Sequence, residues 1–154
     1  MEFISYPDLC VLLHETFPRY PLDRLNRYDI TPATFEKIAE LYNLPLPYKE
    51  LPELLAFEED TEKLYTKLFG ETSVKDGKLI IITDEFIKEK KFAVMGSSYL
   101  HTFIHDYYSE TYGMSLFQPL DVVFWYVDQK LLLLVHHEGY YAWLSYNWCK
   151  RNIR

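Results

Sequence analysis

The feature that most constrains the fold is an unbroken apolar run at residues 122–127, between Asp121 and Asp128. Its β-branched and aromatic side chains are typical of a strand, and it is far shorter than the roughly 20 residues that span a bilayer. Successive side chains of a strand point to opposite faces of a sheet. A strand that is apolar at every position must therefore be covered on both faces, so we predict a central strand with helices packed on it.

Two similar segments follow this run, at residues 131–137 and 140–147. The links around Asp128-Gln129 and Glu138-Gly139 are so short that consecutive strands must be antiparallel. We therefore predict a three-stranded antiparallel meander. A helix over residues 131–135 stays an alternative, since periodicity alone does not separate a short apolar strand from a helix.

Prolines and helical spacing organise the first half of the chain. Seven of the eight prolines lie within residues 1–52 and limit how far a helix can run there. We predict helices at residues 8–17, from Thr31-Pro32 to about Pro45, and from Pro52 to Gly70.

The Asp76-Gly77 turn separates these helices from two predicted strands at residues 79–82 and 92–95. A helix should then begin at Ser97 or Ser98 and end at Gly113, with Leu100, Phe103, Ile104 and Tyr107 facing a core. The predicted class is α+β: short N-terminal helices, followed by a mostly antiparallel sheet with a packed helix and a C-terminal meander. We assign residues 1–154 to a single globular domain.

The composition of the chain argues against several classes of function. The chain has 16 basic and 23 acidic residues, a formal charge of −7, which argues against a nucleic-acid binder that relies on a basic surface. Residues 1–8 lack the features of a secretory signal, and Cys10 and Cys149 form no C-x-x-C pair. We expect a cytoplasmic protein that needs no cofactor and binds neither nucleic acid nor a membrane.

Binding residues are predicted in an acidic segment and among the tyrosines. Dense carboxylates steer association with a basic protein surface, although a solvated helix face would look the same. The 14 tyrosines are too many for all of them to be buried with satisfied hydroxyl groups, so some should lie at a binding surface. The predicted binding residues are Glu50, Glu53, Glu58, Glu59, Asp60, Glu62, Tyr108, Tyr112 and Tyr141.

A metal site is the alternative function that the histidines allow. His101 and His105 lie one helical turn apart and could bind one ion, as in H-E-x-x-H zinc helices, although Thr102 stands in place of the catalytic glutamate. Completing the site requires ligands from elsewhere in the fold. The candidate ligand set is His101, His105, His137 and Glu138, with His136 as the substitute for His137 and Asp106 for Glu138.

A purely structural role is the interpretation that we favour for these histidines. On a helix, His101 and His105 would share a half-buried polar and aromatic face with Tyr108 and Tyr112. Neither a glycine-rich dinucleotide loop, nor a phosphate-binding loop, nor a G-x-S-x-G elbow occurs in the sequence, which lowers the expectation of an enzyme.

A small, acidic, aromatic-rich α+β chain without a catalytic motif resembles the immunity proteins that neutralise toxins of bacterial competition systems. The resemblance rests on composition and on the C-terminal segment of residues 124–139. It implies a cognate toxin held by protein contacts, often through acidic groups that mask a basic active site. We therefore expect a bacterial protein-binding module that inhibits a basic partner, with a metal-dependent hydrolase or a structural subunit as alternatives.

Overall fold

The computed structural model describes residues 1–21, 23, 30–55, 61–70, 72, 74–117 and 121–147. Within these residues, seven strands form an antiparallel sheet in the order β1-β4-β3-β5-β6-β7-β2. The strands are β1 (Glu2–Ser5), β2 (Lys49–Glu50), β3 (Lys78–Ile82), β4 (Lys91–Gly96), β5 (Val122–Tyr126), β6 (Leu131–His136) and β7 (Tyr140–Ser145). The predicted α+β class and the C-terminal meander of β5, β6 and β7 are confirmed.

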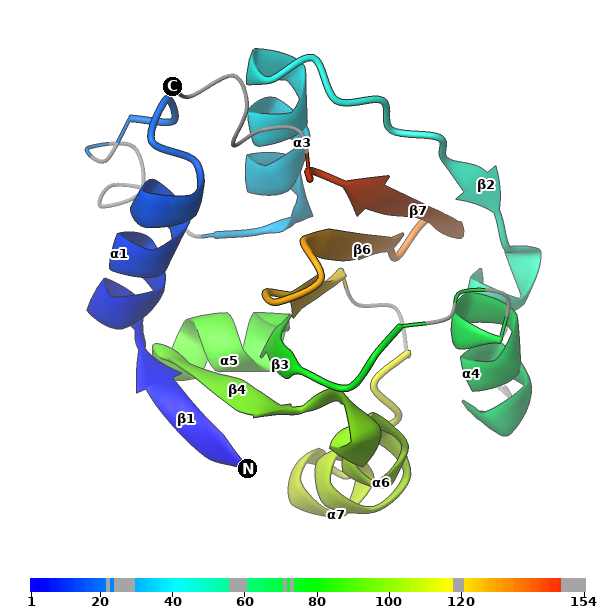
Figure 1. Ribbon diagram of the computed structural model, residues 1–154. Helices are drawn as coiled ribbons and strands as arrows, with labels where there is room; N and C mark the ends of the chain where they lie inside the picture. The colour runs from blue at the N-terminus through cyan, green and yellow to red at the C-terminus, as the bar shows by residue number, and fades with distance from the viewer. Residues whose placement is uncertain are drawn as a thin grey trace.

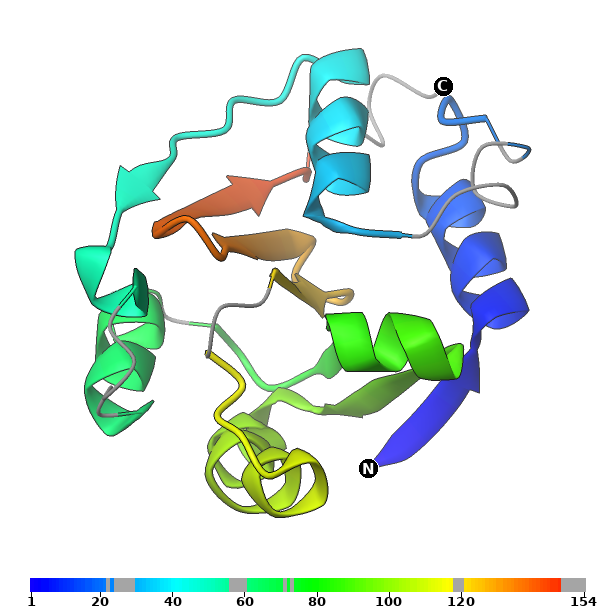
Figure 2. The ribbon, with the colours of Figure 1, turned by 180° about the vertical axis from the view of Figure 1, so that it is seen from behind.

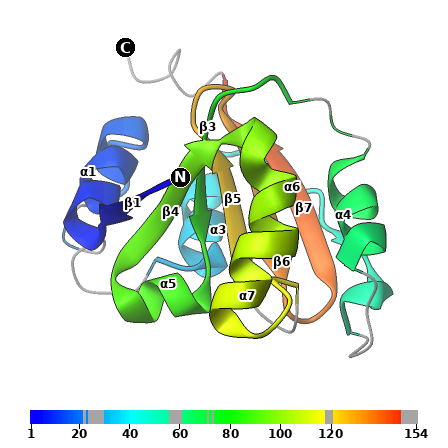
Figure 3. The ribbon, with the colours of Figure 1, turned by 90° about the horizontal axis from the view of Figure 1, so that it is seen from below.

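Helices cover both faces of this sheet. Figure 3 shows α6 and α7 in front of the strands and α3 behind them, and Figure 1 shows α1 and α4 near opposite edges. The helical elements are α1 (Tyr6–Thr16), α3 (Pro32–Leu41), the 3₁₀ turn η1 (Pro52–Leu55), α4 (Thr61–Phe69), α5 (Asp84–Glu89), η2 (Ser97–Tyr99), α6 (Leu100–Thr102), η3 (Phe103–Tyr108) and α7 (Ser109–Tyr112). Within the described ranges, no helix combines the length and the apolar character that crossing a membrane requires.

Most predicted helices are present where their sequence signals lie. The first is α1, the second is α3, and the last is the continuous helical segment from η2 to α7, whose middle part η3 is a π-helix. For the helix predicted from Pro52 to Gly70, η1 and α4 occupy the two ends, and residues 56–60 lie outside the described part of the chain.

The core is centred on β5, whose residues are all buried. On one face, the Trp125 ring lies 6.4 Å from Phe17, which follows α1, and 6.1 Å from Phe35 of α3. On the other face, the Phe124 ring lies 5.2 Å from Phe69 of α4. The prediction of a central strand covered on both faces is therefore confirmed. The alternative helix at residues 131–135 is wrong, because β6 pairs with both β5 and β7.

Three elements, β1, β2 and α5, are not predicted from the sequence. Both edge strands, β1 and β2, are short, and they depend on pairing with β4 and β7 rather than on a local pattern. The helix α5, seen in front of β4 in Figure 2, does have a local signal. Thr83 caps it by accepting a hydrogen bond from the Phe86 N–H at 3.3 Å, and Lys90 ends it in the left-handed conformation.

The contribution of a buried hydrogen bond beside β5 to stability can be tested by mutation. The Trp125 indole N–H donates to the Tyr146 hydroxyl at 2.8 Å. In Tyr146→Phe, this N–H loses its acceptor inside the core, so the free energy of unfolding should fall by about 1–3 kcal/mol. Tyr140→Phe, at an exposed position, is the matched control and should stay within about 0.5 kcal/mol of wild type in urea denaturation. Equal stability of the two variants would contradict this role of the bond.

Candidate functional site

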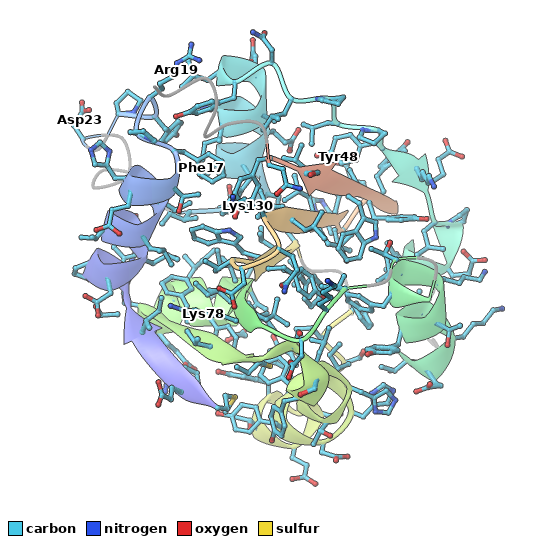
Figure 4. The ribbon with its side chains drawn as sticks, viewed as in Figure 1. Phe17, Arg19, Asp23, Tyr48, Lys78 and Lys130 are labelled. Atoms are coloured by element: carbon cyan, nitrogen blue, oxygen red, sulfur yellow. The ribbon has the colours of Figure 1, made fainter. Side chains whose placement is uncertain are left out.

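A cluster of polar side chains lies around His136, at the end of β6. Its Nε2 atom is 3.0 Å from Glu36 Oε1 and 3.2 Å from the Tyr48 hydroxyl. Glu36 comes from α3, which packs beside β6, and Tyr48 lies close to β7 in the view of Figure 4. The helix over the sheet and the segment before β2 therefore bring a carboxylate and a phenol to the same histidine.

Asp121 extends this group to the neighbouring histidine. It directly precedes β5, and because Val122 pairs with Val135, it lies next to the end of β6. Its Oδ1 atom accepts hydrogen bonds from the His137 backbone N–H at 3.0 Å and from His137 Nδ1 at 2.8 Å. This Oδ1 atom is also 3.8 Å from His136 Nδ1. The hydrogen bond from Nδ1 to Asp121 raises the pKa of His137 above its ordinary value.

Two tyrosines and the turn between β6 and β7 form an open hollow beside these groups. Tyr48, His136, Glu138 and Tyr140 line it, and its volume is about 290 Å³. The Glu138 side chain is 72% exposed and Tyr140 is 40% exposed, so both are accessible to a partner. Glu50 of β2 is directly opposite Tyr140 in the register, which places both side chains on the same face.

Three carboxylates lie in or beside the hollow, those of Glu36, Asp121 and Glu138. Within the described residues, every ion pair of Glu36, Asp121 and Glu138 is with a histidine and none is with lysine or arginine. The pKa of Tyr48 is raised by burial and further by the carboxylates of Glu36 and Asp121. We call this surface, made of Glu36, Tyr48, Glu50, Asp121, His136, His137, Glu138 and Tyr140, the acidic hollow.

The predicted acidic segment makes a smaller contribution than expected. Glu50 is exposed and joins the acidic hollow, but the other described glutamates have intramolecular partners: Glu53 pairs with Lys67, and Glu62 contacts two histidines. The predicted binding residues Glu58, Glu59 and Asp60 lie outside the described residues.

The predicted tyrosines differ in accessibility. A surface role for Tyr108 is wrong, because its side chain is fully buried against Phe86 and Phe103, and burial raises its pKa to about 12. Tyr112 is half-buried and donates a hydrogen bond to the Glu89 carboxylate at 3.2 Å. Tyr141 is half-buried in β7, opposite Lys49.

The same finding corrects the predicted helix face. The sequence pattern places Tyr107 in the core and Tyr108 on the half-buried face, but in the structure the two are exchanged. A π-helix holds more residues per turn than an α-helix, so the position that faces the core after Phe103 moves on by one residue.

His101 and His105 have other neighbours than the predicted metal site or the predicted polar and aromatic helix face would give them. His101 and His105 approach Glu62 of α4 instead of His137 and Glu138. Among the described residues, Glu62, His101 and His105 are the one group of three whose potential metal-ligand atoms all lie within 4.8 Å of one another. His136 and His137 have Glu36 and Asp121 as their partners, and Asp106 is exposed outside the group. The predicted set of His101, His105, His137 and Glu138 is therefore not brought together.

No protein-family model, curated protein or solved structure matches the chain. A function for it must therefore be argued from the chemistry of its own surfaces.

The Asp121–His137 hydrogen bond generates a pH-dependent prediction. Because the pKa of His137 is raised in the folded protein, its contribution to stability is present below the unfolded value of about 6.5 and is lost as the pH rises through the folded pKa. Asp121→Asn should lower the His137 pKa in an NMR titration. The loss of stability caused by this substitution should be larger at about pH 5.5 than at about pH 8.5.

Asp128→Asn is the matched control for this experiment. The Asp128 carboxylate accepts a backbone hydrogen bond from Lys78 at 2.8 Å but pairs with no histidine within the described residues. Its effect on stability should not change over the same pH interval. An unchanged His137 titration in Asp121→Asn would show that the hydrogen bond does not hold the proton.

Proposed function

We propose that the chain is a protein-binding module that recognises a basic partner at the acidic hollow. The observation that carries this proposal is that Glu36, Asp121 and Glu138 have histidines, and neither lysine nor arginine, as ion-pair partners within the described residues. Histidine, unlike lysine and arginine, is not a permanently charged partner, so these carboxylates lack a fixed positive charge beside them within the described residues. A cationic side chain from another protein would supply the missing positive charge.

The chemistry of the hollow suits an arginine or lysine side chain. A guanidinium or ammonium group is attracted to the face of an aromatic ring, here Tyr48 or Tyr140. Glu138 is close enough to the same hollow to accept hydrogen bonds, and arginine pairs with carboxylates through two parallel bonds. Tyrosines beside such contacts are common among the residues that dominate interface energies.

The charge of the whole chain supports the same kind of partner. A net charge of −7 accelerates the approach of a basic protein and repels nucleic acid and anionic membrane surfaces. Within this proposal, the narrower role is that of a bacterial cytoplasmic immunity protein or inhibitor that covers the basic active site of a toxin. That role rests on the resemblance in composition.

The alternative of a metal-dependent hydrolase built on His101 and His105 with His136 or His137 has no support in the arrangement of these residues. The two histidine pairs have separate carboxylate partners.

The first experiment is to isolate the partner and then measure its binding to variants of the hollow. Tagged protein is used to capture partners from its own cell extract at low and moderate salt, and a stoichiometric basic protein lost as salt rises is purified. Tyr140→Ala should weaken its binding by about thirtyfold, the effect of removing a typical hot-spot residue. Tyr99→Ala is the control, because Tyr99 is exposed to a similar extent, 38%, on another element.

Charge reversal tests whether the carboxylates of the hollow accelerate association with the partner by long-range attraction. Glu138→Lys should slow association with the purified partner and reduce its salt dependence, whereas Glu15→Lys, on the exposed side of α1, should have a smaller effect. If Tyr140→Ala and Tyr99→Ala bind equally well, the acidic hollow is not the interface. Charge reversal at Glu58, Glu59 and Glu62 would then test the acidic segment in its place.

A further inference from the structure

We propose that Glu62, His101 and His105 form a binding site for a divalent transition-metal ion, with zinc as the best match. The site is independent of the acidic hollow. It lies where α4 approaches α6, whereas the hollow is built around α3 on the other face of the sheet (Figure 3).

Two imidazole rings converge on one carboxylate oxygen. Glu62 Oε2 is 2.8 Å from His101 Nε2 and 2.9 Å from His105 Nε2. The two rings are stacked, with centroids 4.0 Å apart and planes inclined by 16°, so both Nε2 atoms point to the same side of the helix. The helix spacing aligns the two nitrogens, and α4 adds the oxygen.

The hydrogen bonding of His105 defines which of its nitrogens carries a proton. Its Nδ1 atom is 2.9 Å from the carbonyl oxygen of His101, and a carbonyl can only accept, so Nδ1 is the donor. In the neutral ring, Nε2 is then an unprotonated acceptor that faces the carboxylate. His105 Nε2 is buried and has no hydrogen-bond partner within the described residues.

Two acceptor atoms this close repel each other unless a cation lies between them. A proton on His105 Nε2 would give an ion pair, but of the two ring nitrogens only His101 Nε2 has the geometry of a hydrogen bond to Glu62. A metal ion would satisfy both nitrogens and the oxygen together. Donation from the second ring nitrogen to a backbone carbonyl is also the usual way in which proteins orient a metal-binding histidine.

The distances require only a small adjustment. Zinc bonds of about 2.0–2.1 Å in a tetrahedral arrangement separate the ligand atoms by about 3.3 Å. The present contacts of 2.8 and 2.9 Å would therefore widen by a few tenths of an ångström. Side-chain rotation suffices for this change, because Glu62 is 57% exposed and His101 is 50% exposed.

The ligand types favour zinc over magnesium or calcium. Imidazole nitrogens suit zinc, copper and nickel, whereas magnesium and calcium prefer a shell of oxygens. Two histidines and one glutamate also form one of the ligand sets of catalytic zinc sites, which leave the fourth position to water. The exposure of Glu62 and His101 gives the ion a path of entry from solvent.

The surroundings hold the rings in place. Tyr65, one turn after Glu62 on α4, packs edge-on against His101 at 4.9 Å and His105 at 5.9 Å between ring centroids. His105 also lies in the π-helix η3, and π turns occur frequently at functional sites. The site is therefore supported by a packed aromatic side chain as well as by the helix backbone.

Titration with Zn²⁺ and Co²⁺ tests this proposal. Wild-type protein should bind one ion per chain by calorimetry, and bound Co²⁺ should show the intense visible absorption of tetrahedral coordination. His101→Ala and His105→Ala should each weaken binding by about a hundredfold or more, since loss of even an outer-shell partner costs 10–100-fold. Affinity should also fall as the pH is lowered, because protons compete with the metal ion for the imidazole nitrogens.

His137→Ala is the matched control, because this histidine also pairs with a carboxylate but lies outside the group. It should bind metal like wild type. Glu62→Gln keeps the shape of the side chain and removes its charge, so it should weaken binding as well. Circular dichroism without metal checks each fold, and if His105→Ala does not fold, the exposed positions Glu62 and His101 decide the result.

The outcomes are distinct from those of the partner experiment. One-to-one binding that is lost in the three site variants and retained in His137→Ala supports the metal site, whether or not a basic partner is found. Absence of binding, or equal affinity in all variants, overturns it and leaves a proton-bridged cluster of histidines and a carboxylate.

Discussion

Burial of β5 on both faces is the constraint on which the rest of the structure depends. Its side chains offer no polar face to water, so each face needs its own covering helices and each edge needs a neighbouring strand. Phe17 and Phe35 cover Trp125, and Phe69 covers Phe124. The same covering helices carry Glu36 to the end of β6 and Glu62 to α6, so both polar clusters are consequences of enclosing this strand.

Much of the fold can be predicted because its signals are local. The apolar runs of β5 and β6, the short links between them, and the proline at the start of α3 each act within a few residues. The edge strands cannot be predicted in this way, since the polar residues Lys49 and Glu50 become a strand only by pairing with β7. The π-helix also escapes a search for α-helical spacing, and one extra residue per turn is enough to exchange Tyr107 and Tyr108 between the half-buried face and the core.

The same holds for the polar clusters: contacts between residues close in sequence can be predicted, whereas contacts between distant segments cannot. The spacing of His101 and His105 predicts that they share a helix face, and the structure brings their rings together. Nothing in that spacing identifies Glu62, which is 39 residues away from His101 and reaches it only because α4 packs beside α6. Alternation along the strand predicted at residues 131–137 separates His136 from His137, but it does not reveal that Asp121, which directly precedes β5, contacts both.

The two clusters contain the same residue types but differ in what they can accept. At the acidic hollow, the carboxylates of Glu36, Asp121 and Glu138 are spread around tyrosines and are directed at separate atoms, so their charge is available to a large cationic side chain. At Glu62, one oxygen is shared by the Nε2 atoms of two histidines, and the His105 ring already donates its Nδ1 proton to a backbone carbonyl. A small ion of high charge density satisfies that geometry, whereas a guanidinium group would not fit between atoms 3 Å apart. Convergence of the acceptors, and not the number of histidines, therefore separates the proposed metal site from the proposed protein-binding surface.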